Sequence, residues 1–204
     1  MMINLLLQDP ITYLMAAISI LFAFTIHEYA HAQAIDILGD KTPRMVGRLS
    51  LNPLKHIDPI GMFFILIIGF GWGKPVPFNP LNLKDKKKGP MLIALAGPLS
   101  NLFLALFMAL IIRVFNIGNP GLLNFFLIFI QLNIVLCVFN LIPIPPLDGS
   151  HILFRFLKSH QLKTTLMRNP FASILIAVLL MQYILVPFVV RPLYGLMVVG
   201  FPAF

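Results

Sequence analysis

The sequence predicts an all-α integral membrane protein built as a polytopic helical bundle. Hydrophobic residues make up 59% of its 204 residues, charged residues only 11%, and the mean hydropathy is +0.92, which lies outside the range of soluble globular domains. Long apolar stretches alternate with short segments that carry most of the Lys and Arg residues, as membrane spans and their loops do. The length leaves room for a single membrane-embedded domain, residues 1–204, and we expect no appended soluble domain.

The first apolar stretch predicts a helix over residues 10–38. Asp9 and Pro10 are suited to its cap and first turn, and Gly39 is suited to its end. Such a helix is about 43 Å long, enough to cross a bilayer and emerge. No Lys or Arg precedes Lys41, so the basic region of a secretory signal is missing and we expect this stretch to be retained.

Four further apolar stretches and a short tail follow. The first is short and rich in glycine, which predicts a re-entrant loop or β-hairpin instead of a full crossing. The others are long enough for helices in the membrane. Cys137 lies within one of them and is expected to be a small buried thiol. The stretches cover residues 60–72, 91–115, 122–142 and 171–190, and the tail covers residues 192–204.

The basic residues predict the orientation of the chain. Clusters at residues 41–55 and 74–88 flank the short stretch, so a full crossing there would put one cluster on the wrong side. Both clusters are therefore expected to face the cytoplasm, together with the basic residues of the loop at 155–168. This places the N-terminus outside. The net charge of +8 is explained by these loops and does not indicate nucleic-acid binding.

The first predicted helix contains the run His27-Glu28-Tyr29-Ala30-His31, which includes the only glutamate of the chain. Two histidines four residues apart share one helix face, so both imidazoles can bind one zinc ion while the glutamate polarises a water molecule. If the hydrocarbon begins near Thr12, His27 lies about 22 Å in, roughly 8 Å from the far boundary. A charged group at that depth needs a partner, and a metal ion is a suitable one.

A catalytic zinc usually takes three protein ligands and leaves a fourth position to water. The candidates for the third ligand are His56, His151, His160 and the six aspartates. Five aspartates lie at helix ends or in basic loops, where capping, turns and solvation explain them. They are Asp9, Asp36, Asp40, Asp58 and Asp85.

Asp148 differs because it follows a proline-rich end of a predicted membrane helix, in the run N-L-I-P-I-P-P-L-D-G at residues 140–149. The prolines cannot continue the helix, so the chain unwinds there and can turn a carboxylate back into the bundle. Irregular backbone at membrane depth is tolerated where it is buried in protein or lines a wet cavity. The alternative is that Asp148 caps a following helix over residues 149–158.

The runs H-E-Y-A-H and N-L-I-P-I-P-P-L-D-G resemble the two signature motifs, HExxH and NxxPxPxLDG, of the site-2 protease family of intramembrane zinc metalloproteases. A third run, A-G-P-L-S-N at residues 96–101, is similar to the family's glycine-and-asparagine motif. Residues 47–53, 56–59 and 71–77 are similar to a compact bacterial branch without PDZ or CBS domains.

The resemblance implies three zinc ligands for one ion, His27, His31 and Asp148, with Glu28 as general base. It also implies that Asn140 lies beside the metal, where its amide stabilises the oxyanion, and that Gly97 and Asn101 bind substrate or support the site. It implies a catalytic core of three helices within residues 10–149, followed by C-terminal helices in residues 150–204. The re-entrant segment is implied to receive substrate as an added β-strand.

The expected function is hydrolysis of peptide bonds in or next to transmembrane segments, either in regulated intramembrane proteolysis or in the clearance of membrane peptides. The expected partners are a transmembrane substrate and the lipid bilayer of a bacterial plasma membrane, with the active site near the cytoplasmic face. A metal transporter and a catalytically silent membrane adaptor remain alternatives. Zinc flux would reveal the first, and a cleavage assay separates the second.

Overall fold

The computed structural model describes residues 2–69, 71–157, 164 and 169–199. Its elements are helical, and no β-strand is found within these described ranges. The elements, with short 3-10 turns marked η1 and η2 and a π-helical run marked η3, are α1 (Met2–Gln8), α2 (Pro10–Ile37), α3 (Thr42–Met45), η1 (Pro53–Lys55), α4 (Pro59–Ile68), η2 (Pro80–Asn82), α5 (Gly89–Phe115), α6 (Pro120–Asn140), α7 (Gly149–Phe156), α9 (Pro170–Leu180), η3 (Met181–Val190) and α10 (Arg191–Val198).

Six of these elements begin at an Asn-Pro or Asp-Pro pair. In each pair the Asn or Asp side chain accepts a hydrogen bond from a backbone N–H two or three residues on, and the proline supplies the first helical residue. Proline at this position costs the helix no backbone hydrogen bond, because the first N–H groups of a helix have no partner inside it. The pairs are Asp9-Pro10, Asn52-Pro53, Asp58-Pro59, Asn79-Pro80, Asn119-Pro120 and Asn169-Pro170.

Within the described residues, four segments are long and apolar enough to cross a membrane: Pro10–Ile37, Gly89–Phe115, Pro120–Asn140 and Ala172–Val198. The shortest has 21 residues, which gives about 31 Å of helix, close to the thickness of a bilayer's hydrocarbon core. The all-α membrane fold is therefore confirmed. The stretch at residues 171–190 and the start of the predicted tail form one continuous helical segment through α9, η3 and α10. They were expected from the sequence as separate stretches.

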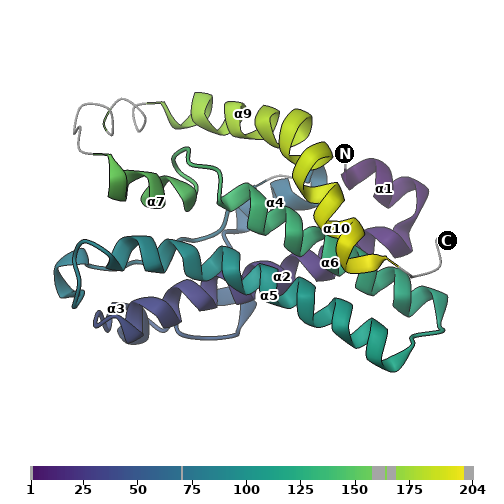
Figure 1. Ribbon diagram of the computed structural model, residues 1–204, viewed down its shortest axis with the longest axis horizontal. Helices are drawn as coiled ribbons and strands as arrows, with labels where there is room; N and C mark the ends of the chain where they lie inside the picture. Colours follow the sequence, from purple (N-terminus) through teal and green to yellow (C-terminus); the bar gives the residue numbers. More distant parts are fainter. Residues whose placement is uncertain (1, 70, 158–163, 165–168, 200–204) are drawn as a thin grey trace.

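Helices α2, α5 and α6 lie side by side along the long axis of the molecule (Figure 1). At one end, on the left of the view, lie α3 and α7; α1 and α10 lie toward the other end. Small residues Ala105 and Ala109 on α5 are buried with Ile130 and Ile134 of α6. Small side chains let neighbouring helices approach closely within a membrane.

The stretch after the first long helix does not form a membrane span. It forms the short helix α4, which ends at Gly69 with a left-handed φ of 88°, and then an extended return segment over residues 71–79. The only isolated β-contact in the described part of the chain is an antiparallel bridge between Ile57 and Gly73. The predicted hairpin is therefore not confirmed, because the Asp58-Pro59 cap starts a helix in its first half.

Candidate metal centre

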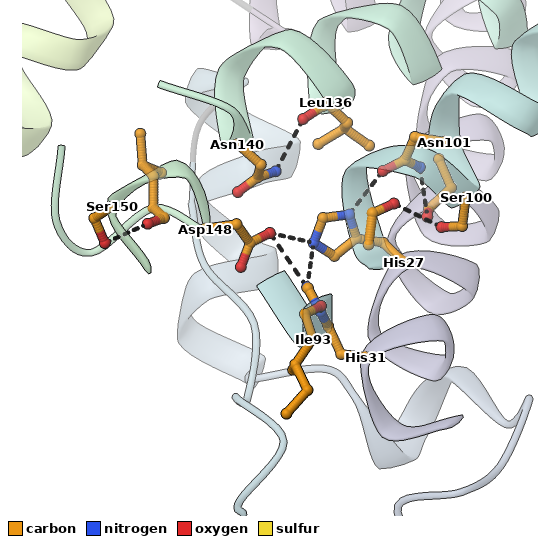
Figure 2. Close-up of polar contacts among 12 residues, drawn as sticks. His27, His31, Ile93, Ser100, Asn101, Leu136, Asn140, Asp148 and Ser150 are labelled. Atoms are coloured by element: carbon orange, nitrogen blue, oxygen red, sulfur yellow. Dashed lines mark hydrogen bonds and ion pairs between the residues drawn. The ribbon is translucent and has the colours of Figure 1, made fainter. Parts of the chain in front are cut away.

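The two histidines of the H-E-Y-A-H run lie on one face of α2 and are buried in the bundle. His27 is 5% exposed and His31 is 8% exposed. Their Nε2 atoms are 3.0 Å apart, and Figure 2 shows the two rings turned toward a common point. The four-residue spacing produces this convergence, because residues i and i+4 of a helix lie one above the other.

Asp148 reaches the same point from the end of α6. One of its carboxylate oxygens, Oδ2, lies 3.2 Å from Nε2 of His27 and 3.2 Å from Nε2 of His31. Its side chain makes no capping hydrogen bond to α7, so the alternative of a simple helix cap is not supported. The three side chains meet at the point predicted from the sequence, and their ligand atoms lie within 4.8 Å of one another.

The loop that carries Asp148 folds tightly back on the end of α6. Its turns are closed by backbone hydrogen bonds from Ile144 to the Ile142 carbonyl (2.8 Å) and from Leu147 to the Ile144 carbonyl (3.0 Å). A Cβ atom at Gly149 would lie 2.2 Å from the Leu141 carbonyl oxygen. Glycine is therefore required beside Asp148, because only a residue without a side chain lets the loop pass so close to the helix end.

The hydrogen bonds behind the rings fix the tautomer of both histidines. Nδ1 of His31 lies 2.8 Å from the carbonyl of Ile93, which accepts only. Nδ1 of His27 lies 2.7 Å from Oδ1 of Asn101. The Asn101 amide nitrogen donates to the carbonyl of Ala23 and to Asn133, each at 3.0 Å, so its oxygen faces His27 as an acceptor. Both Nδ1 atoms therefore carry a proton, and in the neutral form of each ring Nε2 presents a lone pair.

With both rings neutral, three electron-rich atoms face one another. Oδ2 of Asp148 is buried and has no hydrogen-bond partner among the described residues, and it lies 3.2 Å from each Nε2 atom. A cation between them would turn this repulsion into attraction. Two imidazole nitrogens and one carboxylate oxygen form a ligand set of catalytic zinc sites. Tetrahedral ligands about 2.0–2.1 Å from zinc stand roughly 3.3 Å apart, which fits the spacing of these three atoms.

Gly97 gives α5 its close approach to the two rings. A Cβ atom at this position would lie 2.4 Å from Nε2 of His31 and 2.6 Å from Nε2 of His27. The supporting role expected for Gly97 therefore has a geometric basis. The supporting role expected for Asn101, which is 0% exposed, rests on the hydrogen bond that its Oδ1 accepts from Nδ1 of His27.

The cluster opens into a cavity of about 910 Å³ whose walls are mainly apolar. Glu28 and Asn140 line this cavity together with the three clustered side chains. The Asn140 amide nitrogen donates one hydrogen bond to the Leu136 carbonyl at 3.0 Å, which leaves its second N–H for another acceptor. His151 also lines the cavity, yet it does not belong to the three-residue cluster.

The remaining candidates lie elsewhere. His56 is 0% exposed and its Nε2 contacts the Ser50 carbonyl at 2.6 Å. His160 lies outside the described residues. The other aspartates cap helices, close turns or form ion pairs, as expected: Asp9, Asp58 and Asp85 accept from backbone N–H groups, Asp36 pairs with Lys41 and Arg44, and Asp40 binds Thr42, Asn79 and Asn82.

Comparison with known proteins gives the family. The model of "Peptidase family M50" matches residues 115–185, a range that includes Asp148. A Bacillus subtilis protein named "Putative zinc metalloprotease YwhC" is 44% identical over 144 residues, which cover 67% of this chain and 66% of that protein. The chain belongs to peptidase family M50, the site-2 protease family. The resemblance found in its motifs is thereby confirmed.

Two less similar relatives of this M50 protein share the name Rip2. "Putative zinc metalloprotease Rip2" of Mycolicibacterium smegmatis is 34% identical over 140 residues, covering 63% of this chain and 52% of that protein. Rip2 of Mycobacterium tuberculosis H37Rv is 30% identical over 168 residues, which cover 78% of this chain and 63% of that protein. The chain thus spans about half to two thirds of these relatives. No solved structure gives a significant match.

Proposed function

We propose that this M50 protein is an intramembrane zinc metalloprotease that hydrolyses peptide bonds in or next to transmembrane segments of its substrates. The observation that carries the proposal is the meeting of His27, His31 and Asp148, with bare Nε2 atoms and an orphaned carboxylate oxygen, in one cavity with Glu28. The names of the relatives as zinc metalloproteases agree with it.

In this proposal His27, His31 and Asp148 hold one zinc ion. Zinc held there supplies Lewis acidity, which makes a water molecule more acidic and polarises the scissile carbonyl. Glu28 takes the proton from the attacking water and later gives it to the leaving amine, so that one carboxylate serves both steps. The free N–H of Asn140 donates to the oxygen of the substrate carbonyl as negative charge develops on it.

The cavity explains why a membrane segment is the proposed substrate. Its lining is predominantly apolar and comes from α2, α5, α6, α9 and the return segment, and α2, α5 and α6 are themselves candidate spans. An apolar chain that enters such a cavity leaves lipid for a similarly apolar surface. Water, which the reaction consumes, reaches the few polar groups at the metal centre.

The proposed orientation follows from the basic loops. The loop after α2 and the loop before α5 carry Lys41, Arg44 and Lys84 together with residues 86–88, and both leave the same end of the bundle, the end with α3 and α7 (Figure 1). We place this end in the cytoplasm of a bacterial cell. His27 lies 10 residues before the end of α2, about 15 Å along the helix, so the metal centre is nearer to this face.

The proposal is tested with the protein in proteoliposomes containing a library of single-span peptides, and new termini are identified by mass spectrometry. The wild type is expected to cleave a subset of the peptides, and Glu28→Gln to bind zinc equally and lose cleavage by a factor of at least about 10². Cleavage by Glu28→Gln at the wild-type rate would rule out the assigned base. Zinc flux without cleavage would favour the transporter alternative. A comparison of the membrane proteomes of cells that carry the wild type or Glu28→Gln then shows which membrane peptides accumulate without cleavage.

A further inference from the structure

A buried polar pair lies behind one wall of the cavity, in the loop between α3 and α4. Arg48 is 5% exposed and His56 is 0% exposed, whereas the side chain of Arg44 in α3 is 63% exposed. Burying a guanidinium is unfavourable unless strong partners compensate for the loss of water around it. A purely solvating role does not explain an arginine in this position.

The partner of this pair is the backbone of Lys74, in the return segment. The Arg48 guanidinium donates to the Lys74 carbonyl. The Lys74 N–H donates to the His56 carbonyl at 2.9 Å, and Ile57 pairs with Gly73 in the antiparallel bridge. Both backbone polar groups of Lys74 are therefore held by this loop. We call Arg48 and His56 the bracket.

The return segment leaves the bracket and runs along the cavity. Gly73, Pro75, Val76 and Phe78 all line it. A Cβ atom at Gly73 would lie 1.8 Å from Cζ of Phe24, so the backbone rests directly on α2. Phe24 precedes His27 and Glu28 by about one helical turn. The bracket thus fixes the wall at a point close to the proposed catalytic groups.

The downstream end of the wall is held separately by Asp40, which accepts from the Asn79 N–H at 2.6 Å. Between the two anchors, Val76 and Phe78 are partly buried against the cluster of Ile35, Leu83 and Ile93. Pro75 and Pro77 have no N–H group. The position of this part of the return segment therefore depends on its two ends and on side-chain packing. The bracket holds the end at Lys74, which is the end nearer to Phe24.

Two atoms of the bracket, Nε of Arg48 and Nδ1 of His56, have no hydrogen-bond partner within the part of the chain that the structure describes. Burial lowers the pKa of the Arg48 guanidinium, and the Lys74 carbonyl is the polar partner that offsets the loss of water around it.

We infer that Arg48 is a positioning residue: through the Lys74 carbonyl it sets the place of the wall relative to the metal centre, and so selects which peptide bond of a bound substrate is cleaved. The inference rests on the proposed function. It predicts that loosening the bracket spreads cleavage over neighbouring bonds, whereas simple destabilisation lowers the yield of the same products. A misplacement of about 1 Å is enough to reduce catalysis up to 100-fold.

The test compares Arg48→Met with Arg44→Met, which removes an arginine whose side chain is 63% exposed and whose partner Asp36 keeps its ion pair with Lys41. Each variant is reconstituted with one single-span peptide that the wild type cleaves, and the cleaved bonds are mapped. Arg48→Met is expected to keep its zinc, to show a kcat/KM about 10- to 100-fold lower, and to cleave additional adjacent bonds. Arg44→Met is expected to match the wild type. Arg48→Lys, which keeps one donor and the charge, is expected to be intermediate and replaces Arg48→Met if that variant does not fold.

A second arm needs no activity. Val76 is changed to cysteine in a chain whose Cys137 is replaced by serine, and its maleimide labelling rate is measured with each arginine variant. Faster labelling with Arg48→Met but not with Arg44→Met is expected. If labelling differs in this way but the wild type cleaves no peptide, the proposed function is refuted while the structural role of Arg48 and His56 is supported. Equal labelling, or an unchanged set of cleaved bonds in an active enzyme, would refute the positioning role of Arg48.

Discussion

Gly97→Ala tests the geometry of the metal centre with the smallest possible change. The added methyl group would lie 2.4 Å from Nε2 of His31, 2.6 Å from Nε2 of His27 and 2.6 Å from Cε1 of His27. Non-bonded heavy atoms settle at about 3.5 Å or more. Either the rings or α5 must therefore move by about 1 Å.

That movement is large on the scale of metal binding. Ligand distances at a working site hold to about 0.2 Å, and even the loss of a group that only orients a ligand lowers metal affinity about 10- to 100-fold. Because the methyl group displaces both imidazoles at once, Gly97→Ala is expected to weaken zinc binding by at least about 100-fold. The fold should survive, because alanine is the best helix former and α5 is helical on both sides.

Zinc affinity is measured on protein in lipid nanodiscs by equilibration against graded chelator and elemental analysis, and folding is followed by circular dichroism. Gly195→Ala is the matched control, because it lies in helix α10 and a Cβ atom there meets nothing within 4 Å. Zinc affinity of Gly97→Ala within about twofold of this control would show that the two rings do not bind metal where the structure places their Nε2 atoms, and the reasoning would fail.

Two further substitutions test the surroundings of the site. Asn101→Leu removes the acceptor of the His27 Nδ1 proton and is expected to lower zinc affinity about 10- to 100-fold in the same assay; unchanged affinity would contradict the assigned tautomer. Burial raises the pKa of Asp40, but hydrogen bonds from Asn82, Thr42 and Asn79 outweigh it and hold the pKa at about 2. Asp40→Ala is therefore expected to lower the melting temperature at pH 7. The part of the difference that depends on the ionised carboxylate should shrink below about pH 4 and be lost as the pH falls through about 2. A difference that does not change with pH would contradict this account.

The sequence predicted the long helices well because apolar length marked each span. For the first helix, Asp9-Pro10 and Gly39 marked the two ends as well. The first helix was expected over residues 10–38 and is Pro10–Ile37, and the next two were expected over 91–115 and 122–142 and are Gly89–Phe115 and Pro120–Asn140. Both of these helices start two residues earlier than the apolar run. The cause is the same in each, since a proline at the first or second helical position can begin the helix before the apolar run does.

The short elements were harder to predict. Helix α1 was not expected, because its seven residues carry no acidic or basic side chain in their end turns. The glycines in and after the short stretch indicated a break in an ordinary span, but not the contacts that these glycines make. Contact of Gly71 with the Gly61 carbonyl and of Gly73 with Phe24 depends on how α4 folds back. Local sequence does not contain that information.

At the site, the sequence could predict side chains but not backbone partners. His27, His31 and Asp148 were recognisable from their types and spacing, and the prolines before Asp148 explained how it turns inward. The Ile93 carbonyl, which orients His31, has no signal at all in the sequence, because every residue has a carbonyl. Arg48 was counted among topology determinants, since basic residues in loops usually serve that purpose, and only its burial distinguishes it.

Glycine is the residue that makes a polar centre possible inside this apolar bundle. Gly97 brings the backbone of α5 against both imidazoles, Gly149 brings the Asp148 loop against the Leu141 carbonyl, and Gly73 brings the cavity wall against Phe24. At each contact a methyl group would come within 2.4 Å of its neighbour. Backbone therefore packs closely at three places around the site: against both imidazoles at Gly97, beside Asp148 at Gly149, and against the Phe24 ring at Gly73. Substitution of these glycines is consequently expected to disturb the site through the backbone, without removing a ligand.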